Sequence, residues 1–598
     1  MLVPGPQPTI WQASGSFNLK DEIMATIGAF SLVLHSHLPY VLSHGKWPHG
    51  MDWLNEAAAE TYLPLLRTFN QLAAEGHAPK VTIGLSPVLC EQLADPVFKA
   101  DFQSYLAMKA EAARLDRLSF EKSGEVNMVR LAQDWESFYR GIADDFNDLY
   151  AKDIVGAFRK LQDEGQIEII TCAATHGYLP LLSEDAAIDA QIKQGVENYR
   201  KHFGKPPQGI WLPECAYRPY REWSSPLGGG EVRLRRGLEE FLDRHNLRFF
   251  YVDSHLIEGG QALGVYLERF EALKKYYEQF TRGYTEIQDE FKRSPYQSYM
   301  IRSRDDFAGR VYAYVRDPRT GLQVWSGEHG YPGDGSYLDF HKKHFPGGHR
   351  YWRVTSAKSD LGDKLLYDPD VTLDRIDENA GHFKEMIRQI LIHEGKEAEG
   401  LPIVCAPFDT ELFGHWWFEG PRWMYKMLKW TDQDPEIKLM TGSEYLDQVE
   451  THRMVSLPEG SWGEGGFHHI WFNEDTEWSW ELIYPAEKRM VEAARKWVSH
   501  PDPKVQEVLK QLARELLLLE SSDWQFLIST FSARDYAEKR LVEHHLDFER
   551  LYRMLEKLAV GDDPDAEEWD HYRLICERDT LFAELNAEWW TGSDLNWK

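Results

Sequence analysis

The chain has 598 residues, which is too long for one small core and predicts two or three domains. Hydrophobic residues make up 43% and charged residues 27%, the balance of a soluble globular protein. The formal net charge of -29 argues against nucleic acid or an anionic membrane as the partner. No apolar stretch approaches the length that spans a membrane.

Five cysteines are scattered along the chain with no Cys-x-x-Cys pair, so neither a disulfide framework nor a zinc-thiolate site is expected. Residues 1–22 lack the basic start and apolar core of a signal peptide, and we expect residues 1–23 to be a poorly ordered extension or to result from an upstream start. Together these features predict a cytoplasmic protein.

Short apolar runs alternate with helical stretches through most of the chain, which predicts an α/β barrel. Helical spacing fills residues 95–165, which we interpret as a helical insertion in a catalytic barrel formed by residues 24–94 and 166–455. Tryptophan-rich loops and long amphipathic helices then predict a C-terminal helical domain over residues 456–598. The expected strands are 30–34, 81–85, 166–170, 209–212, 249–252, 403–406 and 437–440, with 311–315 and 322–325 expected to pair.

Two carboxylates each follow an apolar strand directly. Glu214 comes after the strand 209–212 and a proline, and Asp409 follows the strand that begins near residue 403. The carboxyl ends of barrel strands meet at one face, where α/β barrels hold their active sites. Two carboxylates at that face are the minimum equipment of a glycosidase-type site, whereas the alternative is a salt bridge at each strand end.

Three histidines also follow predicted strands. His35 and His37 are two residues apart at the end of the first strand, so their side chains point to the same side. His176 follows the third strand. The pair is half of a metal site, or two hydrogen-bonding groups in a sugar pocket, or one core and one exposed histidine; spacing alone leaves all three open.

Aromatic residues reach 13% of the chain, with 22 tryptophans. A large core explains many tryptophans. Carbohydrate binding is the more specific alternative, because flat apolar sugar faces stack on indole rings while the ring N–H still donates a hydrogen bond.

At these residues the chain resembles glycoside hydrolase family 57 and, within it, the 1,4-α-glucan branching enzymes. The resemblance covers most of the chain. The third and fourth of its five blocks are the most specific, and the fifth resembles the helical domain of the branching enzymes. The blocks are His35-Ser-His-Leu-Pro39, His176-Gly-Tyr-Leu-Pro180, Trp211-Leu-Pro-Glu-Cys-Ala-Tyr217, Pro407-Phe-Asp-Thr-Glu-Leu-Phe-Gly-His-Trp-Trp417 and Leu516-Leu-Leu-Leu-Glu-Ser-Ser-Asp-Trp524.

The resemblance implies an incomplete (β/α)7 TIM-like barrel with a helical insertion and a C-terminal α-helical domain. It implies a retaining mechanism with no metal and no cofactor, in which Glu214 is the nucleophile and Asp409 the general acid/base. The apolar residues around Asp409 are expected to raise its pKa. The positions that match substrate-binding residues of the family are His35, His37, Trp53, His176, Tyr266, Trp325, Trp417, Trp462, Trp471 and Asp523.

Among these positions, core packing is the alternative for Trp417, and a cap of the following turn is the alternative for Asp523. Tyr266 resembles a loop-tip tyrosine that shields the glycosyl-enzyme from water.

The function implied by the resemblance is transfer of an α-1,4-glucan segment to a 6-hydroxyl, forming α-1,6 branches in amylose-like chains or glycogen. We expect a monomer or weak homo-oligomer that binds no nucleic acid or membrane. Within the family the alternative is an α-amylase or 4-α-glucanotransferase. The other rivals are a metal-dependent deacetylase or mannosidase with His35 and His37 as ligands, and a glucan-binding scaffold without turnover.

Overall fold

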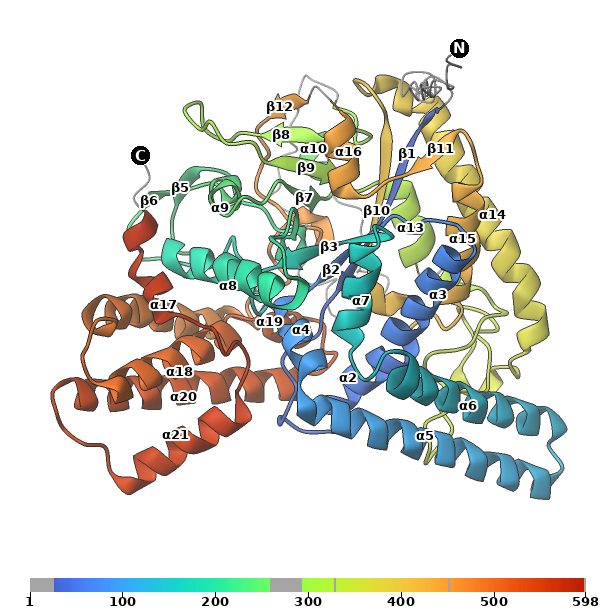
Figure 1. The fold of residues 1–598 in the computed structure, drawn as a ribbon, viewed down its shortest axis with the longest axis horizontal. Helices are drawn as coiled ribbons and strands as arrows, with labels where there is room; N and C mark the ends of the chain where they lie inside the picture. The colour runs from blue at the N-terminus through green and yellow to red at the C-terminus, as the bar shows by residue number, and fades with distance from the viewer. Residues whose placement is uncertain (1–25, 259–292, 327–329, 450–451, 596–598) are drawn as a thin grey trace, which may run out of the picture.

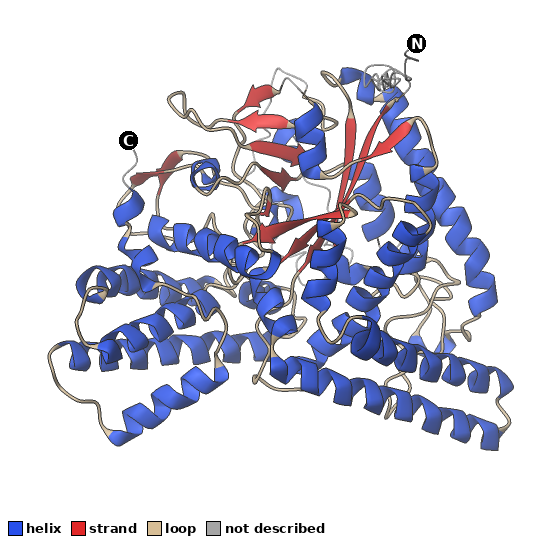
Figure 2. Cartoon of the chain, in the orientation of Figure 1, coloured by secondary structure: helices blue, strands red, loops and turns tan. Residues whose placement is uncertain are grey.

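The computed structural model describes residues 26–258, 293–326, 330–449 and 452–595. Most strands lie in the upper middle of the molecule, with helices below them and to their right, and a few short strands lie at its upper left edge (Figure 2). Seven of the strands belong to one parallel barrel. They are β1 (Gly28–Ser36), β2 (Val81–Leu85), β3 (Ile167–Cys172), β4 (Ile210–Trp211), β7 (Phe249–Val252), β9 (Tyr312–Val315) and β10 (Ile403–Asp409).

Parallel pairing runs around the barrel from β10 through β1, β2 and β3 to β4, and separately from β7 to β9. Two isolated parallel bridges close the ring: Gly209 with Phe249 between β4 and β7, and Arg316 with Cys405 between β9 and β10. A Cβ on Gly209 would collide with the Phe249 ring, so a glycine lets these strands approach. The incomplete (β/α)7 barrel that the resemblance implies is confirmed, with only a single bridge at each of these two junctions.

Three short strands extend this framework. β11 (Ile437–Leu439) pairs with the start of β1, and β8 (Tyr299–Ile301) and β12 (Arg453–Val455) continue the sheet outward from β9. The strand expected at 322–325 is wrong, because these residues end the helix α13 (Pro318–Trp325). Asp317 accepts a hydrogen bond from the Thr320 amide and Pro318 occupies the first helical turn, two signals of a helix start that outweigh a short apolar run.

Helices fill the residues between β2 and β3. They are α4 (Pro87–Ala94), α5 (Pro96–Ser123), α6 (Val126–Asp144) and α7 (Ile154–Asp163). Asp95 caps α5 by accepting from the Val97 amide, and Gly124 ends it in the left-handed conformation. α5 and α6 form a long antiparallel pair that projects at the lower right of Figure 1. No helix within the described ranges is long and apolar enough to cross a membrane.

The C-terminal part of the chain is helical and gathers at the lower left of Figure 1. A buried polar cluster joins it to the loop that follows β1. His44 Nε2 hydrogen-bonds Asp579 at 2.7 Å, and Arg540 donates to the carbonyl oxygen of Tyr40 at 2.7 Å. These contacts fix the helices against the barrel. The helices of this C-terminal part are α17 (Glu477–Trp497), α18 (Pro503–Leu519), α19 (Asp523–Ser529), α20 (Arg534–Ala559) and α21 (Ala566–Arg578).

Candidate active site

The carboxyl ends of β1, β3, β4 and β10 bring the predicted site residues together. His35 near the end of β1 is in register with Asp409 at the end of β10. Cys172 at the end of β3 is in register with Trp211, which ends β4 three residues before Glu214. Residues that are far apart in the sequence therefore meet at one end of the barrel, as the strand pattern predicted.

Glu214 lies on a tight turn formed by Pro213–Cys215 and has a φ of 59°. A left-handed backbone is unfavourable for glutamate, and such strain is concentrated at functional sites where surrounding contacts enforce it. Trp462 supplies two of those contacts: its backbone N–H donates to the Glu214 carbonyl at 3.0 Å, and its indole N–H donates to Glu214 Oε2 at 2.7 Å. The turn aims the carboxyl group at the strand ends.

The carboxyl of Glu214 has an altered acidity. Burial raises its pKa to about 8, the Trp462 hydrogen bond opposes that rise, and the charge of Asp409 adds to it. The side chain is still partly exposed, so solvent offsets part of the effect of burial. The charge effect requires Glu214 and Asp409 to lie close to each other. The raised pKa expected for Asp409 stays a prediction.

A second carboxyl with a raised pKa lies two residues after Asp409. Glu411 accepts from the Tyr62 hydroxyl at 2.5 Å and from the His37 backbone N–H at 3.2 Å. Burial raises the pKa of Glu411 to about 8, with the charge of Asp409 contributing. Glu411 was missed in the sequence analysis. Its position inside the block that ends at Trp417 was the one available signal.

A π-helical turn at Ala58–Tyr62 packs against the segment that follows Asp409. Besides the Tyr62 contact, Thr61 Oγ1 accepts from the His415 backbone N–H at 3.1 Å. Gly414 has a φ of 120°, and a Cβ there would collide with the Glu60 carbonyl. Single π turns often occur at functional sites. Here the π turn contacts the residues that follow Asp409 and limits where they can lie.

The three histidines form one group of rings. His35 Nε2 and His176 Nε2 are 3.0 Å apart, and the His35 ring stacks on Trp211 at 4.8 Å between centroids. The His37 and His176 rings stack face to face at 3.9 Å. Burial lowers the pKa of His35 and of His176 well below the ordinary value, and the neighbouring imidazoles add to this effect. Both rings are therefore neutral near pH 7.

Asp523 reaches this group from the first turn of α19. Its two carboxylate oxygens lie 3.0 and 2.9 Å from His37 Nε2, and the Ser521 hydroxyl donates to it at 2.5 Å. Burial alone would raise the pKa of Asp523, but the facing His37 outweighs it and holds the pKa below the usual value. Ser522, also missed in the sequence analysis, hydrogen-bonds His176 Nδ1 at 2.8 Å. The C-terminal helices thus complete the histidine group.

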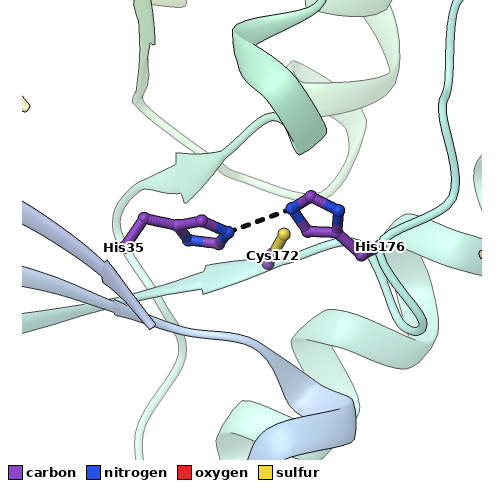
Figure 3. A group of neighbouring side chains, drawn as sticks. All are labelled: His35, Cys172 and His176. Atoms are coloured by element: carbon purple, nitrogen blue, oxygen red, sulfur yellow. Dashed lines mark hydrogen bonds between the residues drawn. The ribbon is translucent and has the colours of Figure 1, made fainter. Parts of the chain in front are cut away.

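Among the residues that the structure describes, two groups of side chains at the strand ends have donor atoms close enough to hold a metal ion: His35 with Cys172 and His176, and His37 with His176 and Asp523. Figure 3 shows the first group, in which the Cys172 thiol lies beside the two facing rings. The pair suggested by the sequence, His35 and His37, has rings stacked 6.0 Å apart and is not itself one of these groups.

The predicted tryptophans differ in exposure. Trp417 is 1% exposed and packs against Tyr337 and Trp423, so the core alternative holds for its ring. Trp471 is also 1% exposed and stacks on Tyr178 at 4.4 Å. A platform needs a free ring face, which neither of these two residues presents.

Trp462 is buried as well, but its indole meets Glu214. The half-buried residues are Trp53, which packs on Tyr536 at 5.7 Å, and Trp325, which ends α13 and packs on Trp416 at 6.3 Å. These two are the better candidates for sugar platforms. Tyr266 lies outside the described residues.

A parallel barrel with two electrostatically interacting carboxyl groups at its strand ends is the arrangement expected of a glycoside hydrolase. The sequence model described as Glycosyl hydrolase family 57 matches residues 31–458, and a second, described as the C-terminal domain of 1,4-alpha-glucan branching enzyme, matches residues 482–590. The chain belongs to glycosyl hydrolase family 57. The predicted family is confirmed.

Similar proteins match along nearly the whole chain. The 1,4-alpha-glucan branching enzyme of Thermococcus kodakarensis is 43% identical over 90% of this chain and 77% of its own length. Its crystal structure, in complex with glucose and additives, superposes with a TM-score of 0.84 at 41% identity and covers 94% of this chain and 96% of that one. The alpha-amylase AmyC of Thermotoga maritima superposes with a TM-score of 0.75 at 29% identity, over 94% of this chain and 99% of that one.

Proposed function

We propose that the chain is a 1,4-α-glucan branching enzyme that acts on amylose-like chains or glycogen in the cytoplasm, as a monomer or weak homo-oligomer. The observation that carries the proposal is the placement of Glu214 and Asp409 at the carboxyl ends of β4 and β10, where Asp523 of α19 also reaches His37. The match of residues 482–590 to the C-terminal domain of 1,4-alpha-glucan branching enzyme also supports the proposal.

In the proposed first step, a Glu214 carboxylate oxygen attacks the anomeric carbon of an α-1,4-linked glucose. The bond to the O4 oxygen breaks, and Asp409 gives its proton to that oxygen, so that the first product leaves with a free 4-hydroxyl. In the second step the 6-hydroxyl of another glucan chain attacks the same carbon. Asp409 takes the proton of that hydroxyl, and the bond to Glu214 breaks. Two inversions retain the α configuration.

The two roles need opposite protonation states. With the pKa of Glu214 raised to about 8, the free site holds a proton on the residue proposed as nucleophile, and the Asp409 charge is one of the reasons. Two interacting carboxyls share their protons as a pair. Transfer of that proton to Asp409 yields an ionised nucleophile and a protonated acid, and the Trp462 N–H stabilises Glu214 once it is ionised.

The α-amylase alternative has a specific observation in its favour. The Thermotoga protein named as an alpha-amylase covers nearly this whole chain, C-terminal helices included, so those helices do not by themselves separate branching from hydrolysis. The balance depends on how well the site excludes water from the glycosyl-enzyme. We propose Tyr266 and the loop beside Trp325 for that role.

Proton NMR of amylose incubated with the protein tests the proposal by counting α-1,6 against α-1,4 anomeric signals. New α-1,6 signals with few new reducing ends support branching. Reducing ends without α-1,6 signals would favour the amylase alternative, and no change in either signal would contradict both.

A further inference from the structure

His35, Cys172 and His176 form a buried cluster of nitrogen and sulfur donors at the floor of the strand-end site. Their exposed fractions are 2%, 0% and 3%. One donor atom of each lies within 4.8 Å of the others, and the two Nε2 atoms face each other at 3.0 Å (Figure 3). The proposed chemistry on Glu214 and Asp409 uses no thiol, which leaves Cys172 without an assigned role.

The hydrogen bonds around His35 and His176 determine which imidazole nitrogen offers a lone pair to an ion. His35 Nδ1 is buried without a hydrogen-bond partner, so the tautomer with a proton there would bury an unsatisfied donor. The favoured tautomer therefore carries the proton on Nε2 and donates it to His176 Nε2. His176 then has its own proton on Nδ1, where the Ser522 hydroxyl accepts it. The His176 Nε2 lone pair points into the cluster.

The other donor group at the site is a poorer fit for an ion. His37 Nε2 is already within hydrogen-bond distance of both carboxylate oxygens of Asp523. Its ring also stacks face to face on His176, with 11° between the planes, so the lone pairs of the two rings lie in parallel planes and do not converge. Metal ions bind imidazole along the in-plane lone pair. An ion that takes His176 Nε2 is therefore directed towards His35 and Cys172.

We propose that His35, Cys172 and His176 form an inhibitory site for a borderline or soft metal ion such as Zn²⁺, Cd²⁺ or Co²⁺. Nitrogen and thiolate donors select such ions over Mg²⁺ or Ca²⁺. Tetrahedral Zn²⁺ with Zn–N bonds of about 2.0–2.1 Å would set the two Nε2 atoms about 3.3 Å apart. Their distance of 3.0 Å would therefore have to increase only slightly when the ion binds.

Binding would release one proton. The Cys172 thiol gives up its proton to solvent as the metal–sulfur bond forms, and His35 moves its proton from Nε2 to Nδ1. The thiol is hard to ionise without an ion: burial raises its pKa well above the ordinary value, and the charges of Glu214 and Asp523 add to this. The same carboxylates would favour the net positive charge of a bound divalent ion.

Inhibition follows from position. Cys172 is in register with Trp211, three residues before Glu214, and His35 is in register with Asp409, so the cluster lies at the same strand ends as the proposed catalytic residues. An ion held there would occupy the His35 and His176 nitrogens, so that neither imidazole could hydrogen-bond a sugar at the strand ends. This part of the inference rests on the proposed function, whereas metal binding itself does not.

The test combines spectroscopy with activity on the full chain. Co²⁺ added to metal-free protein should produce an intense near-ultraviolet band from thiolate-to-metal charge transfer, at one equivalent. Zn²⁺ should displace it and inhibit branching, and a chelator should restore activity. In Cys172→Ala we expect the band to be lost and the inhibitory Zn²⁺ concentration to rise at least tenfold, with metal-free activity unchanged.

Cys405→Ala is the matched control, since Cys405 is also buried in a barrel strand, and it should behave as wild type. Cys172→Ser provides a second variant if the alanine change weakens folding. Equal Zn²⁺ inhibition in the wild type and both Cys172 variants, or no Co²⁺ band in the wild type, would overturn the site. A band without any branching activity would contradict the proposed function and leave the metal site supported.

Discussion

The indole N–H of Trp462 donates a hydrogen bond of 2.7 Å to Glu214 Oε2, while its backbone N–H holds the Glu214 carbonyl. One residue from a glycine-rich loop near position 462 therefore fixes both the strained backbone and the carboxyl of a residue 248 positions earlier. Because a donor to a carboxylate favours its ionised form, this contact links the loop to the acidity of the proposed nucleophile.

Trp462→Phe removes that donor and keeps the ring. A hydrogen bond to a charged group contributes about 1.5–3 kcal/mol, so the pKa of Glu214 should rise and the acid limb of the kcat/KM profile should move upward by about one to two pH units. Activity at pH 7 should fall about 10- to 100-fold. A pH–rate profile of branching measures both effects.

The matched control is Trp471→Phe. Trp471 is equally buried, but its indole nitrogen has no hydrogen-bond partner in the described structure, so the substitution removes no donor. Its acid limb should coincide with that of the wild type. An unshifted limb in Trp462→Phe would show that the indole does not control the ionisation of Glu214.

Glu214→Gln and Asp409→Asn should each reduce transfer and hydrolysis by about 10³-fold or more, because each removes a group that acts in the transition state. Azide distinguishes the two roles. It should restore turnover of an activated α-glucoside in Asp409→Ala with an α-glycosyl azide product, and in Glu214→Ala with the inverted β product. Products of the opposite configuration would exchange the two assignments.

The sequence predicted the barrel strands well because buried parallel strands appear as short apolar runs, and it placed Glu214 and Asp409 at the ends of β4 and β10. It did not predict contacts between distant segments. The Trp462 bond to Glu214 and the Asp523 bond to His37 depend on how loops and C-terminal helices dock, which local patterns do not encode. Burial of Trp417 illustrates the same limit: tryptophan composition alone does not separate a platform from core.

The contact between His44 and Asp579 predicts acid sensitivity of the docked helices. Burial lowers the pKa of His44 to about 4, and nearby Arg540 contributes. In the unfolded chain the pKa of His44 stays near 6.5. As the pH falls from about 6.5 to 4, the unfolded state binds a proton that the folded state does not bind. The free energy of unfolding therefore decreases in this window, by about 3 kcal/mol in total.

His44→Gln tests this expectation, because an amide retains a donor for Asp579 and does not titrate. Chemical unfolding at pH 7 and pH 4.5 should show a smaller loss of unfolding free energy in the variant than in the wild type. The same loss in both proteins would mean that other groups control the acid sensitivity.

Gly414 should be intolerant of any side chain. It has a φ of 120°, and a Cβ there would collide with the Glu60 carbonyl of the π turn at Ala58–Tyr62. Gly414→Ala would therefore displace the loop that follows Asp409 and disturb the end of β10, with a cost above the roughly 1–3 kcal/mol of backbone strain alone. We expect branching to fall at least 100-fold, since a misplacement of about 1 Å already costs about that factor.

Gly400→Ala is the control for the backbone strain, because Gly400 also has a positive φ, 92°, but no atom within 4 Å of the added Cβ. That variant should lose stability by about 1 kcal/mol and keep its activity. If Gly414→Ala behaves like Gly400→Ala, the contact with the π turn does not position Asp409. A selective loss of activity in Gly414→Ala would instead tie the proposed acid/base to this turn.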